Sequence, residues 1–169
     1  IAGNRELIDD LVTHGVKIMY DAERSTFTSY DDPDDRFYFE RASVLSFNDA
    51  SLEKFCAGRG LAAIEELIGE SDKIVLLTLG AKGCIVKTRE GEIAIPAYDV
   101  KPKDTTGAGD TCIAAFLAAA LEGCGPEECA ALAAAQGACC VEAYDAISGL
   151  HTLPWLREKI AAGWTQQGI

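Results

Sequence analysis

The residues Asp104-Thr105-Thr106-Gly107-Ala108-Gly109-Asp110 form a polar, glycine-bearing segment directly before Thr111–Leu121, a run of small and apolar residues. The run predicts a buried helix that starts near Asp110. Two glycines separated only by alanine let a backbone turn tightly and present several N–H groups outward, and the helix start adds the positive end of its dipole. The segment therefore predicts a pocket for an anion that uses no basic side chain.

Asp110 places a carboxylate at the start of this predicted helix, beside the expected anion. Such a carboxylate could act as a general base on a hydroxyl that attacks a phosphorus centre. On the pattern alone, an ordinary turn with an aspartate helix cap is an equal interpretation. A Rossmann dinucleotide loop is not supported, because Cys112 stands where G-x-G-x-x-G needs its last glycine, and the chain contains no Walker P-loop sequence.

On both sides of this segment, helical and strand patterns alternate along the chain. Lys73–Leu79 is a near-continuous apolar run with β-branched members, which is typical of a central parallel strand buried on both faces. The acidic stretch 31–35 predicts an exposed loop. Further strands are predicted at 16–21 and 42–47, a hairpin at 83–96, and helices at 6–12, from about 48, and at 60–68, 126–141 and 153–160. This order predicts one α/β domain over residues 1–169, with a mostly parallel sheet and an inserted hairpin.

Composition narrows the class of protein. The chain has 169 residues and a formal net charge of −12, which disfavours broad binding to nucleic acid or to anionic membranes. The seven cysteines include no C-x-x-C pair, so we expect neither a zinc site nor a disulfide framework, but small buried thiols in a reducing compartment. With no secretory leader and no apolar run of the ~18 residues that a membrane span needs, a cytoplasmic protein is expected.

The run Thr78-Leu79-Gly80-Ala81-Lys82-Gly83, followed by the hairpin and by the D-T-T-G-A-G-D sequence at 104–110, resembles the nucleotide half of the PfkB (ribokinase-like) carbohydrate kinases. The resemblance covers about residues 5–160. It implies a three-layer α/β/α fold and transfer of the γ-phosphate of ATP to a hydroxyl of a sugar or nucleoside, with Mg²⁺. The family's N-terminal half and β lid have no counterpart before Ile1, so we expect the C-terminal, ATP-binding portion. Relatives often dimerise through that lid, which leaves a homodimer open.

The resemblance also implies roles for particular residues. Asp110 would be the base that deprotonates the acceptor hydroxyl, and Gly107, Ala108 and Gly109 would form the anion hole for the transferring phosphoryl group. Asp104 and Thr106 stand where some relatives hold a monovalent cation such as K⁺. The positions expected beside the nucleotide are Thr78 and Gly80, with Lys82 and Gly83 close by.

The chain also departs from the family pattern. Asn48 begins a sequence that in the family is often N-x-x-E, whose glutamate organises Mg²⁺ and phosphate, but Ser51 replaces the glutamate and leaves Asp49 as a substitute. Ala134 stands where some members have an asparagine, and Asp145-Ala146 replaces a usual Gly-Ala, so adenine contacts are not transferred. These departures keep a second hypothesis open, a non-catalytic nucleotide-binding module. A nicotinamide-dependent oxidoreductase lacks its fingerprint here.

Overall fold

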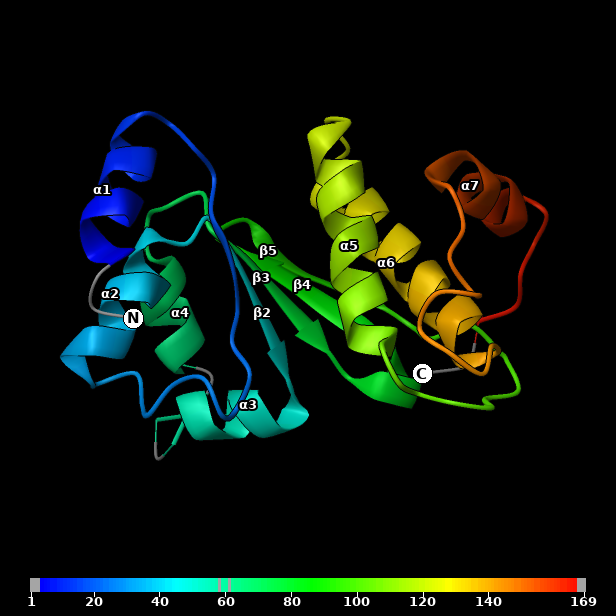
Figure 1. The fold of residues 1–169 in the computed structure, drawn as a ribbon, viewed down its shortest axis with the longest axis horizontal. Coiled ribbons are helices and arrows are strands. Elements are labelled where there is room, and N and C mark those ends of the chain that lie inside the picture. The colour runs from blue at the N-terminus through cyan, green and yellow to red at the C-terminus, as the bar shows by residue number, and fades with distance from the viewer. Residues whose placement is uncertain (1–3, 58, 61, 167–169) are drawn as a thin grey trace. The chain divides into compact units, whose positions relative to one another are not determined.

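The protein is described by a computed structural model that covers residues 4–57, 59–60 and 62–166 (Figure 1). The chain divides into two compact units, Ile1–Leu77 with Lys87–Glu92 and Thr78–Val86 with Ile93–Ile169. The elements in chain order are α1 (Arg5–Thr13), β1 (Met19–Asp21), α2 (Pro33–Arg41), β2 (Val44–Asn48), α3 (Asp49–Phe55), α4 (Ala62–Ile68), β3 (Ile74–Thr78), the 3₁₀ turn η2 (Gly80–Lys82), β4 (Cys84–Thr88), β5 (Gly91–Ile95), α5 (Ala108–Leu121), α6 (Pro126–Val141) and α7 (Leu153–Ala161).

The strands form one sheet in the order β1-β2-β3-β4-β5. β1 and β2 are parallel, with Met19 opposite Val44 and Asp21 opposite Ser46. Only two residues connect β4 to β5, so these strands form the hairpin that the sequence predicts. Among the described residues, no helix has both the length and the apolar character that crossing a membrane requires.

Most predicted elements are present, but the exposed loop predicted for the acidic stretch 31–35 is wrong. The stretch opens α2, because Asp32 caps the helix by accepting from the backbone amides of Asp34 and Asp35. Pro33 occupies the first helical position, where its missing N–H costs nothing. The strand expected at 16–21 is confirmed only over its last three residues, and the helix expected from Thr111 begins at Ala108.

The first unit is built around an aromatic core that joins α2 to β2 and α3. Phe39 of α2 is fully buried and contacts Phe47 of β2 and Phe55 of α3, with ring centroids 6.2 and 5.0 Å away. Phe27 and Tyr30, from the loop after β1, pack against the same ring. Burying each of these aromatic side chains contributes on the order of 2–3 kcal/mol. The loop is thereby fixed against the sheet, and with it the residues at the end of β1.

The second unit is held together by close packing of α5 against α6 (Figure 1). Both helices carry mainly small residues on the facing surfaces, so their backbones approach closely around the fully buried Phe116. Gly137 of α6 lies directly against the Sγ atom of Cys112 in α5, and a Cβ atom added at position 137 would overlap that sulfur. The small residues of α6 therefore allow α5 and α6 to pack closely.

The contact between Gly137 and Cys112 predicts a coupled pair of substitutions. Gly137→Ala should lower the free energy of unfolding by about 1–3 kcal/mol, since the added methyl group overpacks the helix interface. Adding Cys112→Ala removes the obstructing sulfur, so the double variant should be more stable than Gly137→Ala alone. Urea unfolding of all four proteins in the cycle measures this coupling. If the double variant instead loses the sum of the two single variants' losses in free energy of unfolding, the two residues do not interact.

Candidate functional site

The loop before α5 is fixed by hydrogen bonds at both ends. The Lys103 backbone amide donates to the carbonyl of Val141 at the end of α6, 2.7 Å away. Asp104 accepts from the Thr106 backbone amide at 2.9 Å, and this bond, together with one from the Thr106 hydroxyl, holds the pKa of the Asp104 carboxyl below its usual value. The predicted cation residues Asp104 and Thr106 therefore do lie together, and the carboxylate is kept in its charged form.

Gly107 is the point at which this loop becomes helix α5. Its φ of +77° lies in the left-handed region, where a side chain is strained, and it forms the N-cap of the helix. A Cβ atom at this position would also overlap the Cβ atom of Ala146, from the loop between α6 and α7. Both the backbone conformation and the close approach of Ala146 thus require glycine.

The first turn of α5 presents backbone amides that the described residues leave without an acceptor. The Ala108 amide donates to the Thr105 carbonyl at 3.2 Å, and the Thr111 amide donates to Gly107 at 2.9 Å. The amides of Gly109 and Asp110, between them, make no hydrogen bond within the described part of the chain. The Asp110 side chain is exposed and likewise has no partner there. Two N–H groups and a carboxylate are therefore available to a ligand at this helix start.

The residues predicted to lie beside a nucleotide form a tight turn between β3 and β4. The Leu79 amide donates to the Gly83 carbonyl at 2.8 Å, closing the turn around η2. Gly83 has a φ of +95°, and a Cβ atom there would overlap the backbone of β5. Thr78 ends β3 half-buried, whereas Gly80 and Lys82 are exposed. The turn thus presents a backbone edge and one cation to the solvent.

Helix α6 supports both loops through cysteine contacts. Cys84, which follows Gly83, donates its thiol to the carbonyl of Ala130 in α6 at 3.6 Å. Cys112 packs on Gly137, and Cys140 donates to the Thr106 carbonyl at 3.6 Å. Burial raises the pKa of Cys84 to about 12 and that of Cys112 to about 12, so these thiols stay protonated and act as small packing groups. All seven cysteines are free.

Two features of this region carried little sequence signal. Gln136 is the buried amide of α6, and it donates to the Gly149 carbonyl at 2.8 Å and accepts from the His151 amide at 3.0 Å. These bonds fix the loop that carries Ala146 over Gly107. Because Gln136 is a polar residue within an alanine-rich helix, the sequence could have indicated that its side chain holds a neighbouring loop. The contact of Ala146 with Gly107 joins residues far apart in the chain and leaves no local sequence signal.

Asn48 belongs to the other unit, where it caps α3. Its side-chain oxygen accepts from the Ser51 amide at 2.9 Å, and the Ser51 hydroxyl accepts from the Asn48 amide at 2.9 Å, which completes a capping box. Ser51 is fully buried in this arrangement and offers no carboxylate to a metal ion. The Nδ2 atom of Asn48 donates to Oε1 of Glu23 at 3.3 Å, and Asp49 is exposed in the first turn of α3.

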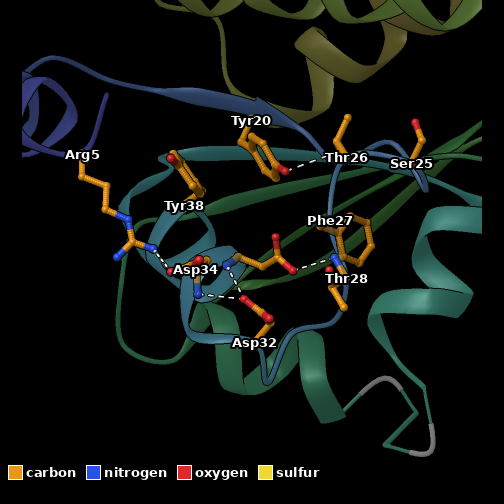
Figure 2. A pocket seen from close by; sticks show the side chains of 10 residues that line it. Arg5, Tyr20, Ser25, Thr26, Phe27, Thr28, Asp32, Asp34 and Tyr38 are labelled. Atoms are coloured by element: carbon orange, nitrogen blue, oxygen red, sulfur yellow. Dashed lines mark hydrogen bonds and ion pairs between the residues drawn. The ribbon is translucent and has the colours of Figure 1, made fainter. Parts of the chain in front are cut away.

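A pocket of about 520 Å³ also lies in the first unit, between the loop after β1 and α2 (Figure 2). Its carboxylates already have structural partners. Asp35 accepts from the Thr28 amide at 2.6 Å, Asp34 pairs with Arg5, and Asp32 caps α2. None of the site residues predicted from the sequence lines it. The pocket therefore lies where the loop after β1 is hydrogen-bonded to α2, and its carboxylates are engaged in structural contacts. Its lining residues are Arg5, Tyr20, Ser25, Thr26, Phe27, Thr28, Asp32, Asp34, Asp35 and Tyr38.

The chain is similar in sequence to known carbohydrate kinases. A model of the pfkB family of carbohydrate kinases matches residues 16–153, most of the chain. An uncharacterised sugar kinase of Archaeoglobus fulgidus is 40% identical over 111 residues, which are 66% of this chain and 44% of that protein. The chain therefore spans less than half the length of this relative.

Solved structures show the same fold. The nucleoside kinase of Methanocaldococcus jannaschii, described as a member of the ribokinase family, matches with a TM-score of 0.75 and 25% identity over 87% of this chain and 48% of that one. A putative ribokinase II from E. coli, solved with ATP and Mg²⁺, matches with a TM-score of 0.79 and 21% identity over 92% and 52%. The chain thus has the predicted α/β, ribokinase-like fold.

The conformation of Gly107 predicts that alanine substitutions at Gly107 and Gly109 change the stability of the protein differently. Gly107→Ala should destabilise the protein by about 1–3 kcal/mol, because alanine is strained at this φ and its methyl group meets Ala146. Gly109→Ala is the matched control, since a Cβ atom there meets nothing within 4 Å. It should leave stability unchanged or raise it by up to about 1 kcal/mol. Urea unfolding compares the two variants, and equal losses would contradict the assigned constraint.

Proposed function

The chain belongs to the PfkB family of carbohydrate kinases, and we propose that it binds ATP and transfers the γ-phosphate to a hydroxyl group of a sugar or nucleoside. The observation that carries this proposal is the start of α5, where the amides of Gly109 and Asp110 lack acceptors among the described residues, beside an exposed carboxylate. The sugar kinase and the nucleoside kinase among the similar proteins support the acceptor class.

The anion hole would be the backbone of residues 107–109 together with the Asp110 amide. Ala108 uses its amide to close the turn onto Thr105, so its part is to hold the turn. The amides of Gly109 and Asp110 would donate to the oxygens of the transferring phosphoryl group, where negative charge spreads during the reaction. Their directions are fixed by the helix and by the Gly107 conformation, so no reorganisation is needed when that charge develops.

Asp110 would take the proton from the attacking hydroxyl. Its carboxylate is exposed and has no hydrogen bond or ion pair in the described part of the chain, so it is available to a substrate. A base in this position lies on the same helical turn as the phosphate-binding amides. The geometry would therefore hold the acceptor oxygen and the phosphoryl group close to each other.

The nucleotide would bind against the turn between β3 and β4. Thr78 and Gly80 lie at the carboxyl end of a buried strand, where open α/β sheets bind their ligands. Lys82 is exposed and has no partner in the described residues, so its ammonium group could pair with a phosphate. Gly83 fixes the turn by its approach to β5.

Mg²⁺ would accompany the ATP and neutralise charge on its phosphates. Asn48, which belongs to the first unit, has its amide oxygen engaged by the α3 cap, so that oxygen is not proposed as a metal ligand. Asp104, charged and backed by Thr106, suits a monovalent cation such as K⁺. The burial of Ser51 favours a second candidate, a module that binds nucleotide without transferring phosphate.

Calorimetric titration with a non-hydrolysable ATP analogue and Mg²⁺, followed by an ADP-release assay over a panel of sugars and nucleosides, tests this proposal. Asp110→Asn should bind the analogue nearly as well as the unaltered protein but lose acceptor-dependent ADP release by about 10²–10⁴-fold. Asp99→Asn, which alters another exposed aspartate in the same unit, is the matched control and should retain activity.

The two candidate functions give different results. Binding without ADP release from the unaltered protein would favour the non-catalytic module. Turnover retained by Asp110→Asn would contradict the role of Asp110 as base, and no nucleotide binding at all would contradict the proposal as a whole.

A further inference from the structure

The pocket of the first unit has two walls of different chemistry. Figure 2 shows the rings of Tyr20 and Tyr38 on one side of the pocket and the carboxylates of Asp32 and Asp34 on the other. All of the lining residues belong to the first unit. The volume of about 520 Å³ lies within the range of roughly 300–1,000 Å³ that is typical of small-ligand sites. The pocket therefore has the size and the mixed lining of a site for a small organic molecule.

The lining of this pocket carries an excess of negative charge. Three aspartates and one arginine line it, and Asp34 forms an ion pair with Arg5. The uncompensated charges are those of Asp32 and Asp35, because no lysine, arginine or histidine among the described residues forms an ion pair with either carboxylate. Two negative charges in a partly enclosed site attract a cationic ligand and repel an anionic one.

Each of the two carboxylates is held by backbone amides through only one of its oxygens. Oδ1 of Asp32 accepts from the amides of Asp34 and Asp35, at 2.8 and 3.2 Å. Oδ2 of Asp35 accepts from the amides of Thr28 and Ser29, at 2.6 and 3.2 Å. The second oxygen of each carboxylate makes no hydrogen bond within the described part of the chain. Both groups are thus fixed in position and still able to accept hydrogen bonds from a ligand.

The tyrosine wall of the pocket also suits a cation. The rings of Tyr20 and Tyr38 stack with their centroids 6.1 Å apart. Burial is the main cause that raises the pKa of the Tyr20 hydroxyl, and the charge of Asp35 adds to the shift, so this carboxylate lies close to the tyrosine wall. Aromatic faces attract cations and also pack against aliphatic chains. An amine in this pocket would therefore have its charge at the aspartates and its methylene groups on the rings.

We propose that this pocket binds an aliphatic diamine, with one ammonium group on Asp32 and the other on Asp35. Each ammonium group carries three N–H donors, which suit the carboxylate oxygens that the backbone amides leave unused. Charge-assisted hydrogen bonds of this kind are stronger than neutral ones. Two ammonium groups also match the two uncompensated carboxylates, so binding neutralises the pocket. The site requires neither ATP nor any residue of the second unit.

Calorimetric titration of the full chain with putrescine, an aliphatic diamine, tests the assignment. We expect one saturable site, and no binding of butanediol, which has hydroxyl groups in place of the amines. Asp32→Asn and Asp35→Asn keep an oxygen for the backbone amides and remove only the charge, so each should weaken putrescine binding by about 10–100-fold. Asp31→Asn is the matched control, since this exposed aspartate is next to Asp32 in the sequence but does not line the pocket. It should bind putrescine like the unaltered protein.

Four other outcomes overturn the assignment. An equal loss of affinity in Asp31→Asn would show only a general attraction of the diamine to an acidic chain, and equal binding of butanediol would show that the charge is not recognised. Unchanged affinity in both Asp32→Asn and Asp35→Asn would place the diamine outside this pocket, and no saturable binding by the unaltered protein would remove the site. Circular dichroism identifies a variant that fails to fold, in which case the other aspartate variant decides.

Discussion

The close approach of Ala146 to Gly107 is the constraint on which the candidate site depends. It requires a residue without a side chain at the point where the loop turns into α5, and the left-handed backbone of Gly107 satisfies this requirement. Because the helix starts immediately afterwards, its first free amides belong to Gly109 and Asp110. The same residues therefore carry the proposed phosphate-binding amides and the proposed base.

This constraint is maintained by the packing of the second unit. Gln136 holds the loop after α6 by two hydrogen bonds, and a buried amide left without these partners would cost about 1–3 kcal/mol. The contact of Gly137 with Cys112 sets how closely α5 approaches α6. Helix α6 thus supports the candidate site, while the proposed anion-binding amides and base lie on α5.

The elements that can be predicted from the sequence are those whose signal is local. The alternation of strands and helices, the hairpin and the glycine-rich loop before α5 follow from periodicity and turn residues, and the structure contains them. The start of helix α2 escapes such a prediction because a stretch rich in aspartate resembles a helix breaker, although Asp32 and Pro33 are a cap and a first helical residue. The bond between Glu23 and Asn48 and the contact of Ala146 with Gly107 join residues far apart in the chain, so no local pattern could predict them.

The proposed function requires that backbone amides at the start of α5 bind the phosphate of a nucleotide. This binding is tested by amide NMR spectra of the ¹⁵N-labelled chain, recorded during titration with a non-hydrolysable ATP analogue and Mg²⁺. The proton resonances of Gly109 and Asp110 should move downfield as new hydrogen bonds form, while those of the turn residues Gly123 and Gly163 stay in place. Stationary resonances of Gly109 and Asp110 while the nucleotide saturates the protein would contradict the account.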